Sequence, residues 1–322
     1  MRARGIARAF ATRIGAALLV VWLTATVVFF ALRLSGDPLE AIMGGPGSQA
    51  GAEATDRARE AYGLDRPLVV QYLAQLWNTA TLQFGDSYSR KQPVAELLAA
   101  NLPPTLVIAT LALLLAWVLV VLGALVVAVA GRGRVGRAIR SALAGLETVA
   151  SVAPQFFVGA VLILVFASGL GLLPATSGSS PTGLVLPVVT LAVPIAGYLA
   201  HVLQGSLVEA DDAPFAVTAR SRGASEARVL FSHTLRHAAL PALALSGWAY
   251  GSLLSGAVVV EALFARQGIG RMLLEAATVR DVPVVIGAVV VIALLYVAIM
   301  LLSDLLEHLV DPRLRRRGVI PA

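Results

Sequence analysis

Two short patterns in this sequence could in principle support chemistry. Residues 131–136 read Gly-Arg-Gly-Arg-Val-Gly and match GxGxxG, the turn with which a strand–helix unit binds a dinucleotide. The apolar run before it, 105–130, is much longer than such a strand, and no acid follows about 20 residues later. His233 and His237, four residues apart on an expected helix over 226–239, could share a metal ion, but no third ligand is placed to complete the shell.

The only lysine, Lys91, does not lie in a GxxxxGK[ST] phosphate-binding loop, so we expect no ATP hydrolysis by this chain. The chain has no cysteine and no GxSxG or HExxH pattern. The sequence therefore predicts no catalytic residue, no cofactor and no metal site.

A polar stretch over 206–241 interrupts the otherwise apolar chain and is the most informative feature of the sequence. It contains four arginines and four acids: Arg220, Arg222, Arg228, Arg236, Glu209, Asp211, Asp212 and Glu226. Gly223 stands near its middle, between two helical patterns, where glycine permits a bend. We expect a helical elbow that docks a partner.

The composition places this elbow in a membrane protein. Of the 322 residues 58% are hydrophobic and 14% are charged, and the mean hydropathy is +0.82. A single water-soluble core cannot bury so much apolar side chain. Runs long enough to cross a bilayer are found over 14–32, 105–130, 148–173, 184–207, 239–260 and 283–302. The fold class predicted is all-α and polytopic, with six transmembrane helices and both termini on one side.

The distribution of basic residues predicts which side that is. Sixteen of the 25 Lys and Arg lie before the first run, in the 131–145 loop, in the polar stretch and after the last run. The positive-inside rule places these segments, and both termini, in the cytoplasm. We attribute the pI of about 10.3 to basic residues that set the membrane topology and attract anionic lipid. No basic patch with interleaved aromatic residues indicates nucleic-acid binding.

These boundaries give a predicted domain organisation. It comprises a cytoplasmic N-terminus over 1–13, transmembrane helix 1 over 14–32, an extracytoplasmic segment over 33–102, a transmembrane core with helices 2–6 over 103–308 that includes a cytoplasmic loop over 208–241, and a cytoplasmic tail over 309–322. The first run is too long for a signal peptide, so we expect it to be retained. Pro103 and Pro104 suit the first turn of the second span.

The extracytoplasmic segment is expected to hold two helices, over 53–62 and from Pro67 to about Thr79. On the second, an apolar face is predicted from Leu68, Tyr72, Leu76, Leu73 and Trp77. This face is expected on the membrane surface or on the tops of the spans, with packing as the simpler alternative.

The middles of the six runs contain no Asp, Glu, Lys or Arg, which argues against an ion-driven carrier. The energy must then come from a partner. The deepest uncharged hydrogen-bonding groups are those of Gln155, Tyr198, Tyr250 and Ser252. They are predicted either to line a path for a solute or to form hydrogen bonds between helices.

Several short motifs, taken in order, resemble one known family. They are residues 34–38 (LSGDP), 62–67 (YGLDRP), 71–73 (QYL), 84–87 (FGDS), 93–97 (PVAEL), 218–223 (TARSRG), 256–261 (GAVVVE), 268–271 (GIGR) and 311–313 (DPR). The chain resembles the permease subunits of ATP-binding-cassette importers, in the dipeptide, oligopeptide and nickel branch. The resemblance runs nearly end to end.

The resemblance implies a type I importer permease in the bacterial inner membrane, forming half of a translocation pathway for di- or oligopeptides. It implies a second related permease, two cytoplasmic ATP-binding subunits and an extracytoplasmic substrate-binding protein as partners. It also implies that the elbow is the loop that couples to the ATPases, through Thr218, Ala219, Arg220, Arg222, Gly223, Ala224 and Glu226. Nickel or another small solute is the alternative cargo, and a stand-alone channel or secondary carrier is the alternative of another class.

The chain also departs from the family pattern. The generic loop begins with Glu-Ala-Ala, whereas residues 217–219 are Val-Thr-Ala. Pro214 stands where an acid is common, and His201 and Gln204 stand where basic residues are common. These departures concern the details of docking.

Overall fold

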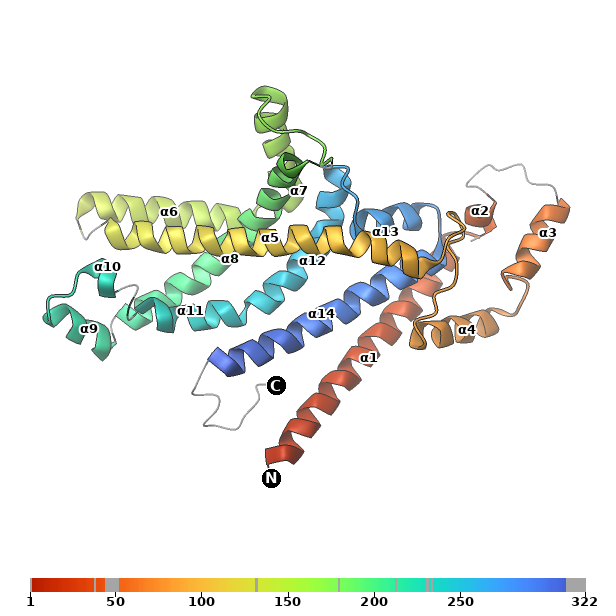
Figure 1. Cartoon of the computed structure of the whole chain (residues 1–322), viewed down its shortest axis with the longest axis horizontal. Helices are drawn as coiled ribbons and strands as arrows, with labels where there is room; N and C mark the ends of the chain where they lie inside the picture. Colours follow the sequence, from red (N-terminus) through yellow and green to blue (C-terminus); the bar gives the residue numbers. More distant parts are fainter. Residues whose placement is uncertain are drawn as a thin grey trace. The chain divides into compact units, whose positions relative to one another are not determined.

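The computed structural model describes residues 2–37, 39–43, 52–130, 133–178, 180–211, 213–229, 232 and 234–310. The elements are α1 (Arg2–Ser35), α2 (Leu39–Ile42), α3 (Ala52–Ala61), α4 (Leu68–Ala80), α5 (Val94–Val129), α6 (Arg134–Val152), α7 (Gln155–Leu162), η1 (Ile163–Gly169), η2 (Pro181–Leu184), α8 (Val185–Asp211), α9 (Pro214–Ser221), α10 (Glu226–Val229), α11 (Leu235–Ala244), α12 (Ser246–Leu263), α13 (Ile269–Thr278) and α14 (Val282–Val310) (Figure 1). Within the described residues the only β pairing is one isolated bridge, between Asp86 and Pro93. The all-α prediction is confirmed.

The described residues divide into two compact units. The first comprises the described parts of Met1–Thr105 and Gln267–Ala298, and the second those of Leu106–Arg266 and Ile299–Val319. Helices α5 and α14 each contribute residues to both units.

Three described helical segments are long and apolar enough to cross a bilayer: Val94–Val127, Pro181–Leu207 and Val282–Ser303. Two bent pairs, α6 with α7–η1 and α11 with α12, raise this number to five if each pair is one span. In α1, Leu18–Leu34 forms a shorter apolar stretch. A chain with several membrane-crossing helices is therefore observed, whereas six spans and the side of the termini stay predictions.

The predicted span over 148–173 is not one continuous helix. Helix α6 ends at Val152, α7 begins at Gln155, and the two axes differ by 109°. The cause is Pro154, which has no backbone N–H to donate and which forces the preceding Ala153 into an extended conformation (φ −66°, ψ 125°).

The predicted placement of Pro103 and Pro104 in a first helical turn is wrong, because α5 begins at Val94 and carries both prolines in its interior. Next to the prolines, the Thr105 side chain bonds to two backbone groups. The Thr105 hydroxyl donates to the carbonyl of Asn101 (3.3 Å) and accepts from the backbone N–H of Ile269 (2.9 Å). The Thr105 hydroxyl thus links α5 to the start of α13.

In each unit, segments approach closely at positions where a glycine has no side chain to separate them. In the first unit, Gly287 of α14 lies against Val94 and Phe84. In the second, Gly197 of α8 lies against the backbone of α6, and Gly247 of α12 lies against Ser303. Gly247 is followed at intervals of four residues by Gly251 and Ser255, a spacing of small residues that allows close helix contact.

Helices α3 and α4 agree with the two helices expected in residues 33–102. Pro67 precedes α4 and accepts the first backbone hydrogen bonds, from Val70 (2.9 Å) and Gln71 (3.2 Å). The predicted single apolar face of α4 is wrong. Tyr72 and Leu76 are partly buried, whereas the other three of the five residues, Leu68, Leu73 and Trp77, are exposed.

Candidate functional site

The elbow consists of α9, a turn at Gly223, and α10, and follows directly on the long helix α8. Pro214 occupies the first turn of α9, where its missing N–H leaves no bond unmade. The helix ends because Gly223 adopts φ +81°, a conformation that L-residues rarely take. The N–H of Gly223 donates to the carbonyl of Arg220 (2.9 Å), and that of Ala224 donates to the carbonyl of Ala219 (3.2 Å).

A small apolar core fixes the two short helices of the elbow to each other. Ala216, Ala219 and Val229 are buried, and Ala224 packs against them. The elbow is therefore a folded unit with a defined surface. Of the predicted docking residues, Ala219 belongs to this core and is 8% exposed.

The outer surface of the elbow carries a hollow of about 540 Å³. Its lining residues are Pro214, Phe215, Thr218, Ala219, Arg222, Gly223, Ala224 and Arg228. Two large apolar side chains of α9 are exposed, Phe215 at 38% and Val217 at 55%. Arg222 and Arg228 are exposed beside them. A hollow with exposed apolar groups and arginines at its edge has the mixed chemistry of a protein-docking surface.

The other predicted residues of the coupling loop are placed as follows. Thr218, Arg222 and Gly223 are exposed, and Arg220 and Ala224 are partly buried. Glu226 begins α10, but its side chain lies outside the described part of the structure. His233 likewise lies outside the described residues, and those residues contain no cluster of three or more metal-binding side chains.

The four uncharged polar groups predicted in the spans all lie in the second unit, each with different neighbours. The Tyr250 hydroxyl of α12 is 2.8 Å from the Thr110 hydroxyl of α5 and 3.4 Å from the carbonyl of Leu106. Tyr250 therefore bonds between helices, as one of the two alternatives expected. Ser252 is partly buried.

Gln155 and Tyr198 are placed differently. Gln155 is the first residue of α7, and its side-chain amide lies against Gly256 of α12. Tyr198 of α8 is 36% exposed, and its ring lies 4.7 Å from that of Trp248 on α12, with the planes tilted by 44°. The described contacts do not gather the four predicted residues into one cluster.

A polar cluster between α6 and α8 was not predicted from the sequence. Glu147 is 8% exposed and accepts a hydrogen bond from the side-chain amide of Gln204. Next to it, the Thr148 hydroxyl lies 3.2 Å from a ring nitrogen of His201. The sequence marked His201 and Gln204 only as departures from the family pattern. Their proximity to Thr148 and Glu147 depends on how α6 packs on α8.

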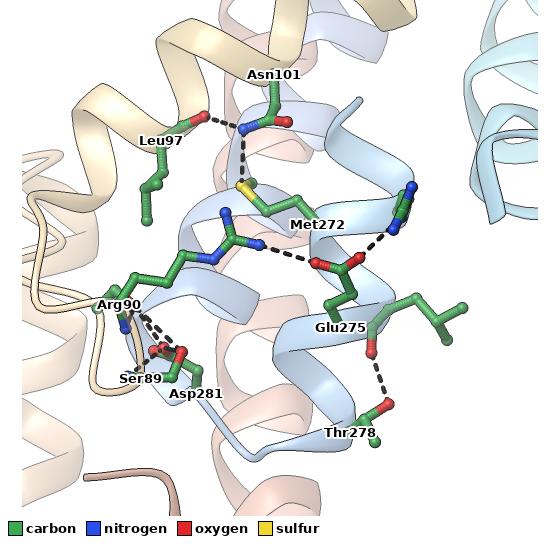
Figure 2. A network of polar contacts seen from close by, with 11 residues as sticks. Ser89, Arg90, Leu97, Asn101, Met272, Glu275, Thr278 and Asp281 are labelled. Carbon is green, nitrogen blue, oxygen red and sulfur yellow. Dashed lines mark hydrogen bonds and ion pairs between the residues drawn. The ribbon is translucent and has the colours of Figure 1, made fainter. Parts of the chain in front are cut away.

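A second unpredicted network lies in the first unit, around Asp281 at the start of α14 (Figure 2). Asp281 is fully buried, and its carboxylate accepts hydrogen bonds from the hydroxyls of Ser87 (2.6 Å) and Ser89 (2.7 Å). It also accepts from the backbone N–H groups of Tyr88 (3.1 Å) and Ser89 (2.9 Å). Four donors compensate for the desolvation of this carboxylate.

The rest of this network is more exposed. Arg90 pairs with Glu275 (2.8 Å), which also accepts from Arg271 (2.8 Å) (Figure 2). Burial raises the pKa of the neighbouring Tyr88 phenol to about 12. The network ties the loop before α5 to α13 and α14, so a structural role accounts for it.

Residues 121–316 match the family described as binding-protein-dependent transport system inner membrane component. The chain belongs to this family: it is a multi-pass inner-membrane permease component of an ABC importer, a class of subunit that is not itself catalytic.

The relatives that match nearly the whole chain include two named transport permeases. A putative peptide transport system permease protein of Brucella abortus (strain 2308) is 34% identical over 313 residues, covering 94% of this chain and 97% of the relative. The glutathione transport system permease protein GsiC of Escherichia coli (strain K12) is 32% identical over 290 residues, covering 90% of this chain and 92% of the relative. A crystal structure of an amino acid ABC transporter gives a TM-score of 0.49 at 20% identity, covering 68% of this chain and 94% of that chain.

Proposed function

We propose that this permease forms half of an ATP-driven import pathway for short peptides, paired with a second, related permease. The partners of the complete machine are two cytoplasmic ATPases and an extracytoplasmic binding protein. The peptide assignment is supported by the names of the relatives, one a peptide and one a glutathione transport permease, because glutathione is itself a small peptide.

The elbow is the observation that best supports the coupling role. It is a folded, exposed unit of two short helices with its own buried core, a hollow and exposed Phe215. Helical elements that present apolar anchors and arginines are suited to docking in a groove of a partner protein. Because the elbow follows directly on α8, movement of a docked ATPase would be transmitted to that helix.

Reconstitution into proteoliposomes tests this function. Vesicles with the complete set of subunits should take up a labelled dipeptide or glutathione only when ATP is present on the side of the membrane that carries the ATPases. Vesicles with the permeases alone should take up none. Uptake by the permeases alone would refute the importer assignment in favour of a channel or carrier, and ATP-dependent uptake of nickel but of no peptide would refute the cargo.

The sidedness of the elbow is tested separately. Reporters fused after Arg317 and inserted at Gly133 should be cytoplasmic, and one inserted at Ser89 should be external. A cytoplasmic signal from Ser89 would contradict the six-span topology.

The route through the membrane is proposed to pass Gln155, Tyr198, Tyr250 and Ser252. Because the chain has no cysteine, single cysteines at these four positions can be labelled without background. A water-soluble thiol reagent should label them, and label more during ATP turnover. Tyr250, which bonds to Thr110, is the position at which a packing role is best supported. Absence of labelling at all four would leave only interhelical packing.

A further inference from the structure

Helix α4 has its polar and apolar residues reversed relative to a helix that faces water. The exposed residues are all apolar: Leu68, Val69, Val70, Leu73, Ala74, Trp77 and Ala80. The polar residues are all partly or fully buried: Gln71, Tyr72, Gln75, Asn78 and Thr79. The helix contains no charged residue. In water this arrangement would expose a continuous apolar face, with Trp77 at 70%.

The inward polar groups are bound within the first unit. The Gln71 amide donates to the carbonyls of Leu64 (3.2 Å) and Arg66 (2.7 Å), and its oxygen accepts from Arg33 of α1. The Thr79 hydroxyl donates to the carbonyl of Gln75 (2.8 Å). The Gln71 and Thr79 side chains are thus hydrogen-bonded on the inner side of α4, whereas the described structure shows no protein that covers the apolar side.

The position of α4 along α1 indicates what covers the apolar side. The Tyr72 hydroxyl is 2.9 Å from the Thr26 hydroxyl, and the Tyr72 ring contacts Phe29 and Phe30 at centroid distances of 5.7 and 5.4 Å. The apolar stretch of α1 ends at Leu34. Eight residues of helix correspond to about 12 Å, so α4 contacts α1 well inside the end of its apolar stretch.

The exposed surface of α1 beside this contact is itself apolar. Val27 is 64% exposed and Phe30 is 38% exposed, on a helix of a membrane-embedded permease. The apolar face of α4 therefore continues an exposed apolar surface of α1, a helix that is expected to cross the bilayer. The preceding helix of the same segment contrasts with it: α3 carries Glu53, Asp56, Arg57, Arg59 and Glu60 and is suited to water.

We propose that α4 is an in-plane membrane helix, seated at the boundary of headgroups and acyl chains in the leaflet crossed by the C-terminal half of α1, with lipid as the partner of its apolar face. Interfacial helices bury such a face about 5–10 Å into this boundary, and tryptophan favours this depth. A protein that binds only transiently accounts for this face less well than lipid does. Each time such a protein dissociated, the whole apolar face of α4 would be exposed to water.

The test uses single cysteines in the full chain, purified with its partner subunits in nanodiscs of phosphatidylethanolamine and phosphatidylglycerol. Trp77→Cys reports on the apolar face, and Ala54→Cys, an exposed position on α3, is the matched control. Each cysteine carries a polarity-sensitive fluorophore. Quenching is measured with iodide in water and with lipids spin-labelled near the top of the acyl chain.

At position 77 we expect quenching by the spin-labelled lipid and an iodide quenching constant at least about fivefold below that at position 54. Position 54 should show the opposite pattern. Equal access of iodide to both positions would overturn the proposal. Position 77 shielded from both quenchers would also overturn it, because a protein would then cover the face. Leu73→Cys, which keeps Trp77, carries the same measurement if Trp77→Cys fails to assemble.

Discussion

Gly223 allows a sharp test of the coupling role of the elbow, because its backbone conformation, and not its packing, is what requires glycine there. Its φ is +81°, and a Cβ added there meets nothing within 4 Å. Alanine at this position therefore costs about 1–2 kcal/mol of left-handed backbone strain, with no steric clash. Since 1.4 kcal/mol is a factor of ten, we expect the equilibrium constant for forming the native turn to fall about tenfold.

Proline is expected to be more damaging than alanine. It fixes φ near −65° and removes the N–H that bonds to the carbonyl of Arg220, so the native turn cannot form. Asparagine tolerates the left-handed region best among the other residues. ATP-driven uptake should therefore fall in the order Gly, Asn, Ala, Pro at residue 223, and co-purification of the ATPases should fall in the same order.

Gly133→Ala is the matched control. Gly133 also has open space around its Cβ and also stands outside a helix, before α6, but its φ is −71°. This change should leave uptake and ATPase binding unaltered. Wild-type uptake by Gly223→Pro, with normal membrane insertion of every variant, would refute the coupling role of the elbow. Equal loss in Gly133→Ala would refute the backbone explanation.

Three further predictions concern stability, measured by thermal unfolding of the purified protein. Gly197→Ala should lower the Tm, because its Cβ would lie 2.6 Å from backbone atoms of α6 and overpacking costs about 1–3 kcal/mol, whereas Gly205→Ala has open space and should not. Asp281→Ala should cost about 3 kcal/mol or more, since it leaves buried donors such as the Ser87 hydroxyl without an acceptor; an unchanged Tm would contradict the network. The Tyr88 phenol has a pKa of about 12 in the folded protein and about 10 in the unfolded chain, so the unfolded chain loses its proton first. The stability of the fold should therefore decrease between pH 10 and pH 12, and Tyr88→Phe should make this decrease smaller.

Local sequence features predicted several parts of the structure well. The apolar runs predicted the membrane class. Two helices were predicted in the outer segment, one over 53–62 and one from Pro67, and both are present as α3 and α4. Gly223 predicted the turn of the elbow. In each case the cause acts within a few residues: hydropathy decides the solvent, proline limits hydrogen bonding, and glycine permits a left-handed turn.

Local features did not predict which prolines would break a helix. Pro154 breaks its helix by 109°, whereas Pro103 and Pro104 lie inside a continuous helix. Beside the two prolines, the Thr105 side chain bonds to Ile269, far along the chain, a contact that no local pattern indicates. A proline alone does not reveal whether such a partner exists.

By itself, the sequence determined that this is an all-helical membrane protein with a polar elbow, because composition and short-range patterns decide those properties. The permease class rested on the resemblance of its motifs to a known family. Only the tertiary structure decided which side of α4 is inward and which groups surround Asp281, whose partner Ser87 is 194 residues away along the chain. It also decided that Glu147 meets Gln204. The physical reason is that burial and hydrogen bonding depend on neighbours in space, and these neighbours come from helices distant in sequence.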